Sequence, residues 1–174
     1  MRRAILLLTT MAVALVGLVT AGSGVALAFD CGAGSCFGTP GDDLMIGTSA
    51  DQGLHGLGGD DLIRGLGGND SLTGDEGDDA VHGGSGRDRV EGNSGADKAT
   101  GGSGDDRVTG ASGNDLLIGD SGEDTLRAGS GADRVEAQDG FADSISCGDG
   151  SRDLVIFDQG LDIVDADCEA RRPS

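Results

Sequence analysis

Residues 38–136 read as eleven consecutive blocks of nine residues: GTPGDDLMI, GTSADQGLH, GLGGDDLIR, GLGGNDSLT, GDEGDDAVH, GGSGRDRVE, GNSGADKAT, GGSGDDRVT, GASGNDLLI, GDSGEDTLR and AGSGADRVE. Positions 1 and 4 are Gly, and position 6 is Asp, in ten of the eleven blocks. Position 8 is apolar in every block. Four positions kept in step over 99 residues do not arise from composition alone, so the block is a structural unit.

The pattern within a block predicts strands and turns. A helix is excluded, because each of the recurring glycines would cost about 1 kcal/mol relative to Ala. Collagen is excluded, because Gly does not occupy every third position. Positions 7–9 place an inward apolar residue between two that can be polar, which is typical of a very short strand. Positions 1–6, rich in Gly and Asp, favour a turn. Two blocks then form an 18-residue coil, and stacked coils predict an all-β fold: a parallel β-roll, or two-sheet solenoid.

The Asp residues at position 6 are candidate calcium ligands. Residues that lie 18 apart stack on one edge of the roll. One edge carries Asp43, Asp61, Asp79, Asp97, Asp115 and Asp133, and the other carries Asp70, Asp88, Asp106 and Asp124, with Gln52 in place of a fifth. Stacked carboxylates about 4.8 Å apart repel one another unless a cation lies between them. Adjacent pairs give five sites on one edge and three on the other, so we expect about eight Ca²⁺ ions.

Calcium fits this ligand set better than other cations. The turns offer carboxylate and carbonyl oxygens, which Ca²⁺ accepts in flexible geometry, whereas Mg²⁺ demands a tight octahedron. Zn²⁺ is a weaker candidate without His or Cys ligands. The alternative is that these Asp residues are solvated turn formers, but their fixed register favours metal binding. We expect position 5 to point outward, Asp51 to make up in part for Gln52, and a weak or empty site there.

Apolar burial alone is too small to fold the chain. One buried side chain in nine residues contributes far less than the conformational entropy lost on ordering them. We therefore expect folding to be coupled to Ca²⁺ binding in the Gly/Asp turns.

The blocks GGSGRDRVE and GGSGDDRVT resemble the RTX, or hemolysin-type, calcium-binding nonapeptide G-G-x-G-x-D-x-U-x, where U is a large apolar residue. The resemblance covers residues 38–136 and implies a β-roll that holds Ca²⁺ by the ten position-6 Asp side chains and by backbone carbonyls of the turns. The chain departs from the pattern at position 2, where Gly is replaced by Leu57, Leu66, Asp75, Asn93, Ala111 and Asp120.

Residues 1–28 have the features of a cleaved secretory signal peptide. A basic start, Met1-Arg2-Arg3, precedes an apolar run that ends in the A-x-A type site Val25-Ala26-Leu27-Ala28. The alternative is an uncleaved membrane anchor. Cleavage would take the net charge from −19 to −21, which disfavours nucleic acid and anionic membranes as partners. We expect a secreted, extracellular protein whose protein partners are unknown.

Four cysteines flank the repeats: Cys31 and Cys36 in an N-terminal segment, 29–37, and Cys147 and Cys168 in a C-terminal region, 137–174. An even number in an exported chain favours disulfides. Three pairings are open, and sequence position favours Cys31–Cys36 and Cys147–Cys168. The alternative is free or metal-binding thiols.

The C-terminal region is predicted to continue the roll irregularly and then cap it. The period slips to ten, but Asp143 and Asp153 keep the Asp-x-apolar step. Residues 161–164 could add a last strand, and Arg171-Arg172-Pro173 would block the edge. We expect Phe141 and Phe157 to pack in this cap.

No catalytic constellation is present in the sequence. It contains neither G-x-S-x-G nor H-E-x-x-H. His55 and His82 are three blocks apart, which places them on opposite sheets. We therefore expect a non-enzymatic calcium-binding protein. The alternative is a calcium-stabilised cell-surface adhesin or extracellular matrix spacer.

Overall fold

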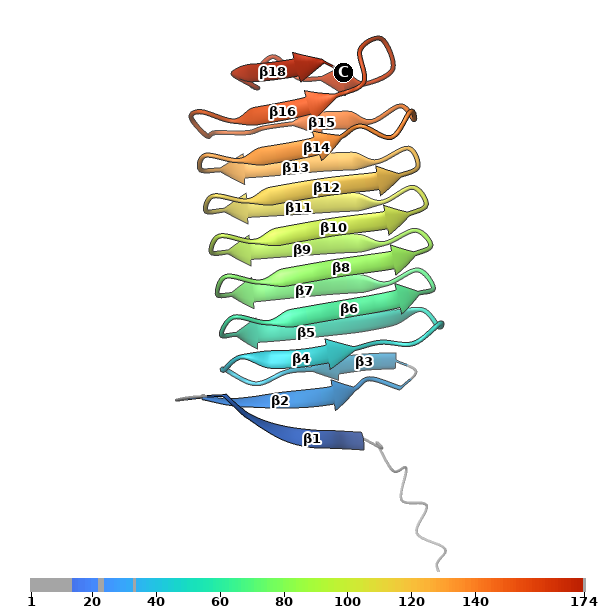
Figure 1. Ribbon diagram of the computed structural model, residues 1–174, viewed down its shortest axis with the longest axis vertical. Helices are drawn as coiled ribbons and strands as arrows, with labels where there is room; N and C mark the ends of the chain where they lie inside the picture. Colours follow the sequence, from blue (N-terminus) through green and yellow to red (C-terminus); the bar gives the residue numbers. More distant parts are fainter. Residues whose placement is uncertain (1–13, 22–23, 33, 174) are drawn as a thin grey trace, which may run out of the picture.

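The computed structural model describes residues 14–21, 24–32 and 34–173, and in these residues the regular structure consists of strands. The strands form two parallel sheets of ten and eight strands, and only β1 and β2 pair antiparallel. Successive strands alternate between the sheets, so each pair of strands completes one coil. Figure 1 shows the coils stacked along one long axis, with even-numbered and odd-numbered strands running in opposite directions. The predicted parallel β-roll is confirmed.

The ten-stranded sheet contains β1 Ala14–Ala21, β2 Gly24–Asp30, β4 Asp43–Ile46, β6 Leu62–Gly67, β8 Ala80–Ser85, β10 Lys98–Ser103, β12 Leu116–Ser121, β14 Arg134–Ala137, β16 Leu154–Phe157 and β18 Ala170–Pro173. The eight-stranded sheet contains β3 Gly34–Phe37, β5 Gln52–Gly58, β7 Ser71–Glu76, β9 Arg89–Ser94, β11 Arg107–Ser112, β13 Thr125–Ser130, β15 Ser144–Ser146 and β17 Ile163–Val164. Partners in neighbouring strands are 18 residues apart throughout the repeats, as in Lys98↔Leu116 and Arg89↔Arg107.

The core is a single column of position-8 side chains between the two sheets. All eleven are at most 1 % exposed: Met45, Leu54, Ile63, Leu72, Val81, Val90, Ala99, Val108, Leu117, Leu126 and Val135. Ile145 and Val155 extend the column into the irregular repeats. The inward alternation predicted from the sequence therefore holds in every block.

The strands are longer than predicted. They run from position 7 through position 3 of the next block, as in Leu62–Gly67, rather than over positions 7–9 alone. The prediction failed because position 2 continues the parallel ladder in the left-handed region of φ. From the third block onward this position has positive φ whether it is Gly or not, with values of 82° at Leu57 and 93° at Ala111. At the six positions of these blocks where another residue replaces this glycine, a residue with a Cβ is therefore held in the left-handed region, which strains the backbone.

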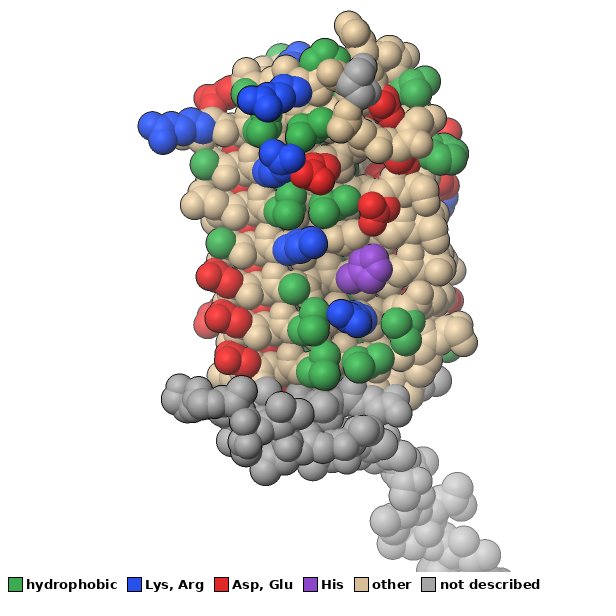
Figure 2. Space-filling model, viewed as in Figure 1, with side chains coloured by type: hydrophobic (Ala, Val, Ile, Leu, Met, Phe, Trp, Pro, Cys, Tyr) green, Lys and Arg blue, Asp and Glu red, His purple; other side chains and the backbone are tan. Residues whose placement is uncertain are grey.

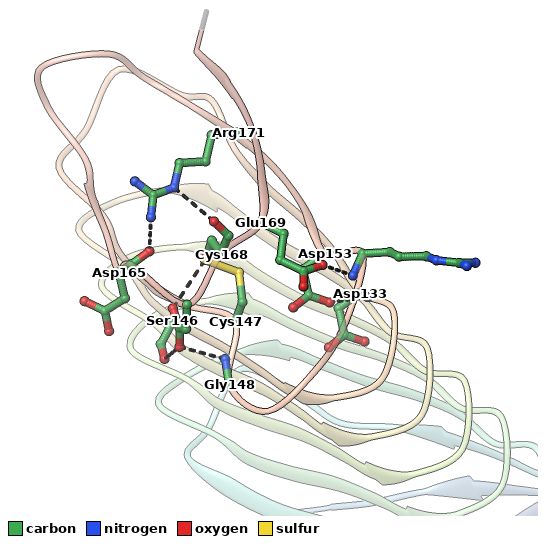
Figure 3. The surroundings of a disulfide bond; sticks show 11 residues. Asp133, Ser146, Cys147, Gly148, Asp153, Asp165, Cys168, Glu169 and Arg171 are labelled. Atoms are coloured by element: carbon green, nitrogen blue, oxygen red, sulfur yellow. Dashed lines mark hydrogen bonds between the residues drawn. A yellow bond between two sulfur atoms is a disulfide. The ribbon is translucent and has the colours of Figure 1, made fainter.

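A disulfide lies at each end of the described roll. Cys31 is bonded to Cys36 and Cys147 to Cys168, which are the pairs that sequence position favours. At the C-terminal end, the Arg171 guanidinium donates to the carbonyl oxygens of Cys168 and Asp165, beside the disulfide (Figure 3). These contacts close the last coil.

The cap differs in part from the prediction. Phe157 packs against the core, but Phe141 is 49 % exposed, so its predicted packing is wrong. Its turn carries the extra residue of the ten-residue period. The strand expected over 161–164 is reduced to Ile163–Val164.

Part of the predicted signal peptide, residues 1–13, 22 and 23, lies outside the described residues. Residues 24–30 pair in parallel with β4 at the N-terminal end of the ten-stranded sheet. Among the described residues, no helix is long and apolar enough to cross a membrane.

Position 2 yields a stability prediction. A residue with a Cβ in the left-handed region costs about 1–2 kcal/mol, so Ala111→Gly should raise the free energy of unfolding by up to about 1 kcal/mol. The matched control is Ala96→Gly at an exposed site outside the left-handed region, which should lower it by about 0.4–1 kcal/mol. Urea denaturation in saturating calcium measures both, and equal destabilisation by the two changes would contradict this account.

Candidate metal centre

The position-6 Asp side chains form a hydrogen-bonded ladder along each edge of the roll. From Asp61 onward, Oδ1 of each accepts the backbone N–H of the position-6 residue in the preceding coil, at N···O distances of 2.7–2.9 Å. Asp61 accepts from Asp43, and Asp70 accepts from Gln52 in the same way. The two edges predicted from the 18-residue spacing are therefore present, and all ten predicted Asp residues lie on them.

These carboxylates are buried and only half satisfied. Each is 1–3 % exposed, although each is expected to be ionised when solvated. In the described structure, one oxygen of each lacks a hydrogen-bond partner: Oδ1 of Asp43 and Oδ2 of Asp61, Asp70, Asp79, Asp88, Asp97, Asp106, Asp115, Asp124 and Asp133. A buried carboxylate oxygen without a partner costs several kcal/mol in a folded protein. Its regular recurrence indicates that a ligand completes each turn.

From the third to the tenth block, the glycine at position 1 lies against the unpartnered oxygen of the position-6 Asp. A Cβ built on Gly65 would overlap Asp70 Oδ2, and it would lie 2.5 Å from the carbonyl oxygen of Gly83 in the next coil. Equivalent contacts recur at Gly56 and Gly83. Glycine is favoured at position 1 of these blocks because a Cβ would overlap oxygen atoms of the turn.

Carbonyl oxygens at positions 2 and 4 face the following coil. A Cβ on Gly84 would overlap the Leu66 carbonyl oxygen, and one on Gly86 would overlap the Gly68 carbonyl oxygen. Each gap between coils is therefore bordered by carbonyl oxygens from the coil below and from the coil above, beside a carboxylate. An all-oxygen, anionic environment of this kind fits Ca²⁺ and lacks the nitrogen and sulfur ligands that favour Zn²⁺.

Burial raises the pKa of nine of these carboxyl groups above the ordinary value: Asp61, Asp70, Asp79, Asp88, Asp97, Asp106, Asp115, Asp124 and Asp133. The dominant cause is loss of hydration, the N–H donated from the preceding coil opposes it, and neighbouring Asp residues add to it. The pKa is raised to about 7 at Asp61, Asp106, Asp124 and Asp143, and to about 6 at Asp70, Asp79 and Asp115. Without a cation, keeping these carboxyl groups ionised near neutral pH therefore lowers the stability of the folded roll.

A second ladder, at position 5, was missed in the sequence. These side chains are exposed, as expected, but they also accept backbone N–H groups from the following coil: Asp42 from Asp60, and Asp60 from Asp78, at 3.0 and 2.9 Å. Asp51 belongs to this ladder, since its Oδ1 accepts from Asn69. Asp51 therefore does not replace a carboxylate at position 52, and that expectation is wrong. The preference for Asp and Asn at position 5 could have indicated this role.

In the first two blocks, threonine donates to a position-6 side-chain oxygen, although Oδ1 of Asp43 remains without a partner. Gln52 is buried, its Oε1 accepts from the N–H and hydroxyl of Thr48, and its Nε2 donates to the carbonyl oxygens of Cys31 and Gly32. Thr39 donates in the same manner to Oδ2 of Asp43. The G-T start of these blocks thus supplies donors where later blocks leave an oxygen unpartnered, which agrees with a weak or empty site at Gln52.

The ladders continue beyond the residues predicted as ligands. Asp143 Oδ1 accepts from Asp124, and Asp153 Oδ1 accepts from Asp133, at 2.8 and 2.9 Å. Both are 1 % exposed with an unpartnered Oδ2. They were omitted because the period changes from nine to ten, although the Asp-x-apolar step was a sufficient indication.

Other metal-binding side chains do not assemble a second centre in the described part of the chain. Cys147, Asp167 and Cys168 lie together, but the two sulfur atoms are bonded to each other and are not thiolates. His55 lies on β5 and His82 on β8, in opposite sheets as predicted. His55 stacks on Phe37 with ring centroids 4.9 Å apart.

Comparison with known proteins agrees with this geometry. A family model described as the RTX calcium-binding nonapeptide repeat (4 copies) matches residues 55–90, 82–117 and 109–141. These overlapping matches extend from the second block into the first irregular repeat and together span half of the chain. No curated protein matches the chain.

The raised pKa values predict that acid stabilises the metal-free roll. Asp in an unfolded chain titrates near 3.8, so the stabilisation is complete below a pH of about 4 and is lost as the pH rises through 6 to 7. In EDTA, the β signal in circular dichroism should therefore be larger at pH 4.5 than at pH 7.5, and calcium should restore the full signal at pH 7.5. Sedimentation velocity controls for aggregation where the net charge is small. A β signal that grows with pH in EDTA would contradict the assignment.

Proposed function

Because the chain belongs to the RTX calcium-binding nonapeptide repeat family, we propose that it is a secreted calcium-binding protein whose roll folds when Ca²⁺ fills the turns. The observation that carries this proposal is the row of buried carboxylates, each with one unpartnered oxygen. A divalent ion between adjacent Asp side chains would remove their repulsion and satisfy these oxygens. The coupling follows because an ion that binds only the folded chain stabilises it by mass action.

The proposed ligands are the ten Asp residues at position 6 together with carbonyl oxygens of the glycine-rich turns. Their adjacent pairs give about eight Ca²⁺ ions. Asp143 and Asp153 could extend each ladder by one pair. We keep eight, the number of adjacent pairs among the ten position-6 Asp residues, as the proposed number.

The carboxylates of the ladders are poorly suited to catalysis. At 1–3 % exposure they cannot contact a substrate outside the roll, and bound calcium would hold them in their ionised form. We accordingly propose a non-enzymatic role. No observation on the described residues favours the adhesin or matrix-spacer alternative.

An isosteric pair of substitutions tests the ligand assignment. Asp97 lies between Asp79 and Asp115 on one inner ladder, so Asp97→Asn should remove up to two bound Ca²⁺ ions and raise the calcium midpoint of folding severalfold. The matched control is Asp78→Asn, because Asp78 is exposed and its Oδ1 accepts from Ala96, which an amide oxygen can also do. Native mass spectrometry counts the ions in each variant. The assignment fails if the Asp97 variant binds the parent number.

Secretion is proposed on the leader-like residues 1–28 and is consistent with the two disulfides. Cleavage after Ala28 would remove β1 and most of β2, and it would leave β4 as the first complete strand of the ten-stranded sheet.

Intact mass measurement of the exported chain should therefore give a protein that begins at Phe29. A full-length chain recovered with membranes would instead support the uncleaved anchor.

A further inference from the structure

The outer faces of the two sheets differ in chemistry although the same repeat positions build them. On the eight-stranded sheet, positions 7 and 9 of β7, β9, β11 and β13 are hydroxyl-bearing or charged: Ser71, Thr73, Arg89, Glu91, Arg107, Thr109, Thr125 and Arg127. On the ten-stranded sheet, the same positions of β4, β6, β8, β10 and β12 are mainly apolar or basic: Leu44, Ile46, Leu62, Arg64, Ala80, His82, Lys98, Thr100, Leu116 and Ile118. The fold therefore does not require apolar residues at these positions.

Figure 2 shows the face with the even-numbered strands, where hydrophobic, basic and His side chains are interleaved, while a column of acidic side chains lies along the edge. Leu62 and Leu66 are 37 % and 48 % exposed on this face. Its chemistry is unusual in a chain of net charge −19.

A trough crosses the middle of this face because small residues lie between large ones. The strand register forms three rows across β6, β8, β10 and β12: Leu62, Ala80, Lys98 and Leu116; Arg64, His82, Thr100 and Ile118; and Leu66, Gly84, Gly102 and Asp120. In the last row, the two glycines place no side chain between Leu66 and Asp120. Thr100 is only 8 % exposed and contributes to the floor. The hollow measures about 590 Å³ and is broadly open to solvent.

The trough is apolar at its walls and basic at its rim. Leu62, Leu66 and Ile118 line it, and Arg64, His82 and Lys98 border it. Arg64 and Lys98 are exposed and take part in none of the ion pairs found among the described residues. Asp120 is the only acid among the lining residues. The side chains therefore offer an apolar surface beside two unpaired cations.

We propose that this trough binds a small amphiphilic anion, that is, a molecule with one apolar body and one sulfonate, sulfate or carboxylate headgroup. The apolar body would lie over Ala80 and Thr100 between the walls, and the headgroup would face Arg64 and Lys98. Charge complementarity favours this occupant over a second copy docked through the same face, because such a copy would bring the same cations, Arg64 and Lys98, together. Because the walls of the trough stand above its floor, a small molecule fits it better than the flat surface of a lipid bilayer does.

The test uses a soluble probe with this chemistry, 1-anilinonaphthalene-8-sulfonate, and its uncharged analogue N-phenyl-1-naphthylamine. Calcium-saturated protein, shown by circular dichroism to be folded, is titrated with each probe and followed by fluorescence. One sulfonate probe should bind per chain. Ala80→Leu should weaken binding of both probes at least tenfold, because it fills the trough; Leu occupies the same repeat position at Leu62 and Leu116, so the roll should accept it. The matched control is Thr125→Leu on the other sheet, which should leave binding unchanged.

The double variant Arg64→Gln/Lys98→Gln tests the cations. It should weaken binding of the sulfonate by roughly three- to tenfold and leave binding of the uncharged analogue as it is. Unchanged binding to the Ala80 variant, or equal loss of both probes in the double variant, would overturn the proposal. Sedimentation velocity adds a further outcome: a calcium-dependent dimer that Ala80→Leu dissociates would assign the trough to a second copy and also overturn it.

Discussion

The structure depends on carboxylate groups that are buried in vertical register with one oxygen left unpartnered. From Asp61 onward, one oxygen of each position-6 Asp is already used, because it accepts the backbone N–H of the coil below, as Asp88 does from Asp70. This bond fixes the rise from coil to coil and orders the turn. The second oxygen lies in a space that glycine keeps open. The same residue therefore joins two coils and leaves a negative charge that the protein alone does not neutralise.

The remaining features follow from this constraint. Only one side chain per block enters the core, so the turns must contribute much of the order of the roll, and their contribution requires a cation. The outer ladder at position 5 adds a hydrogen bond between coils only where the accepting residue is Asp or Asn. The ladder is interrupted at Ala96, because alanine has no side-chain oxygen to accept an N–H. The two ends use other means. Thr39 and Thr48 donate hydrogen bonds at the first turns, and a disulfide with Arg171 holds the last coil.

Much of this arrangement could be predicted from the sequence, because its period is strict. The two sheets, the core column and the two edges of Asp residues all follow from a nine-residue repeat whose units alternate in direction. The length of the strands could not be predicted, because it depends on Leu57 and Ala111 adopting a left-handed conformation that their residue types disfavour. Asp143 and Asp153 were missed as members of the ladders because insertions shift the period while the stacking continues. The trough on the ten-stranded sheet was not predicted, because it becomes visible only when residues 18 apart are compared. A search at a period of nine does not separate the two sheets.

Small-angle X-ray scattering of the chain at pH 7.5, first in EDTA and then with stepwise calcium, tests the central claim most directly. The account predicts an expanded chain in EDTA, with a radius of gyration of about 40 Å, and a cooperative compaction to about 15–20 Å as calcium is added. A compact roll in EDTA, with the same scattering curve before and after calcium, would contradict it.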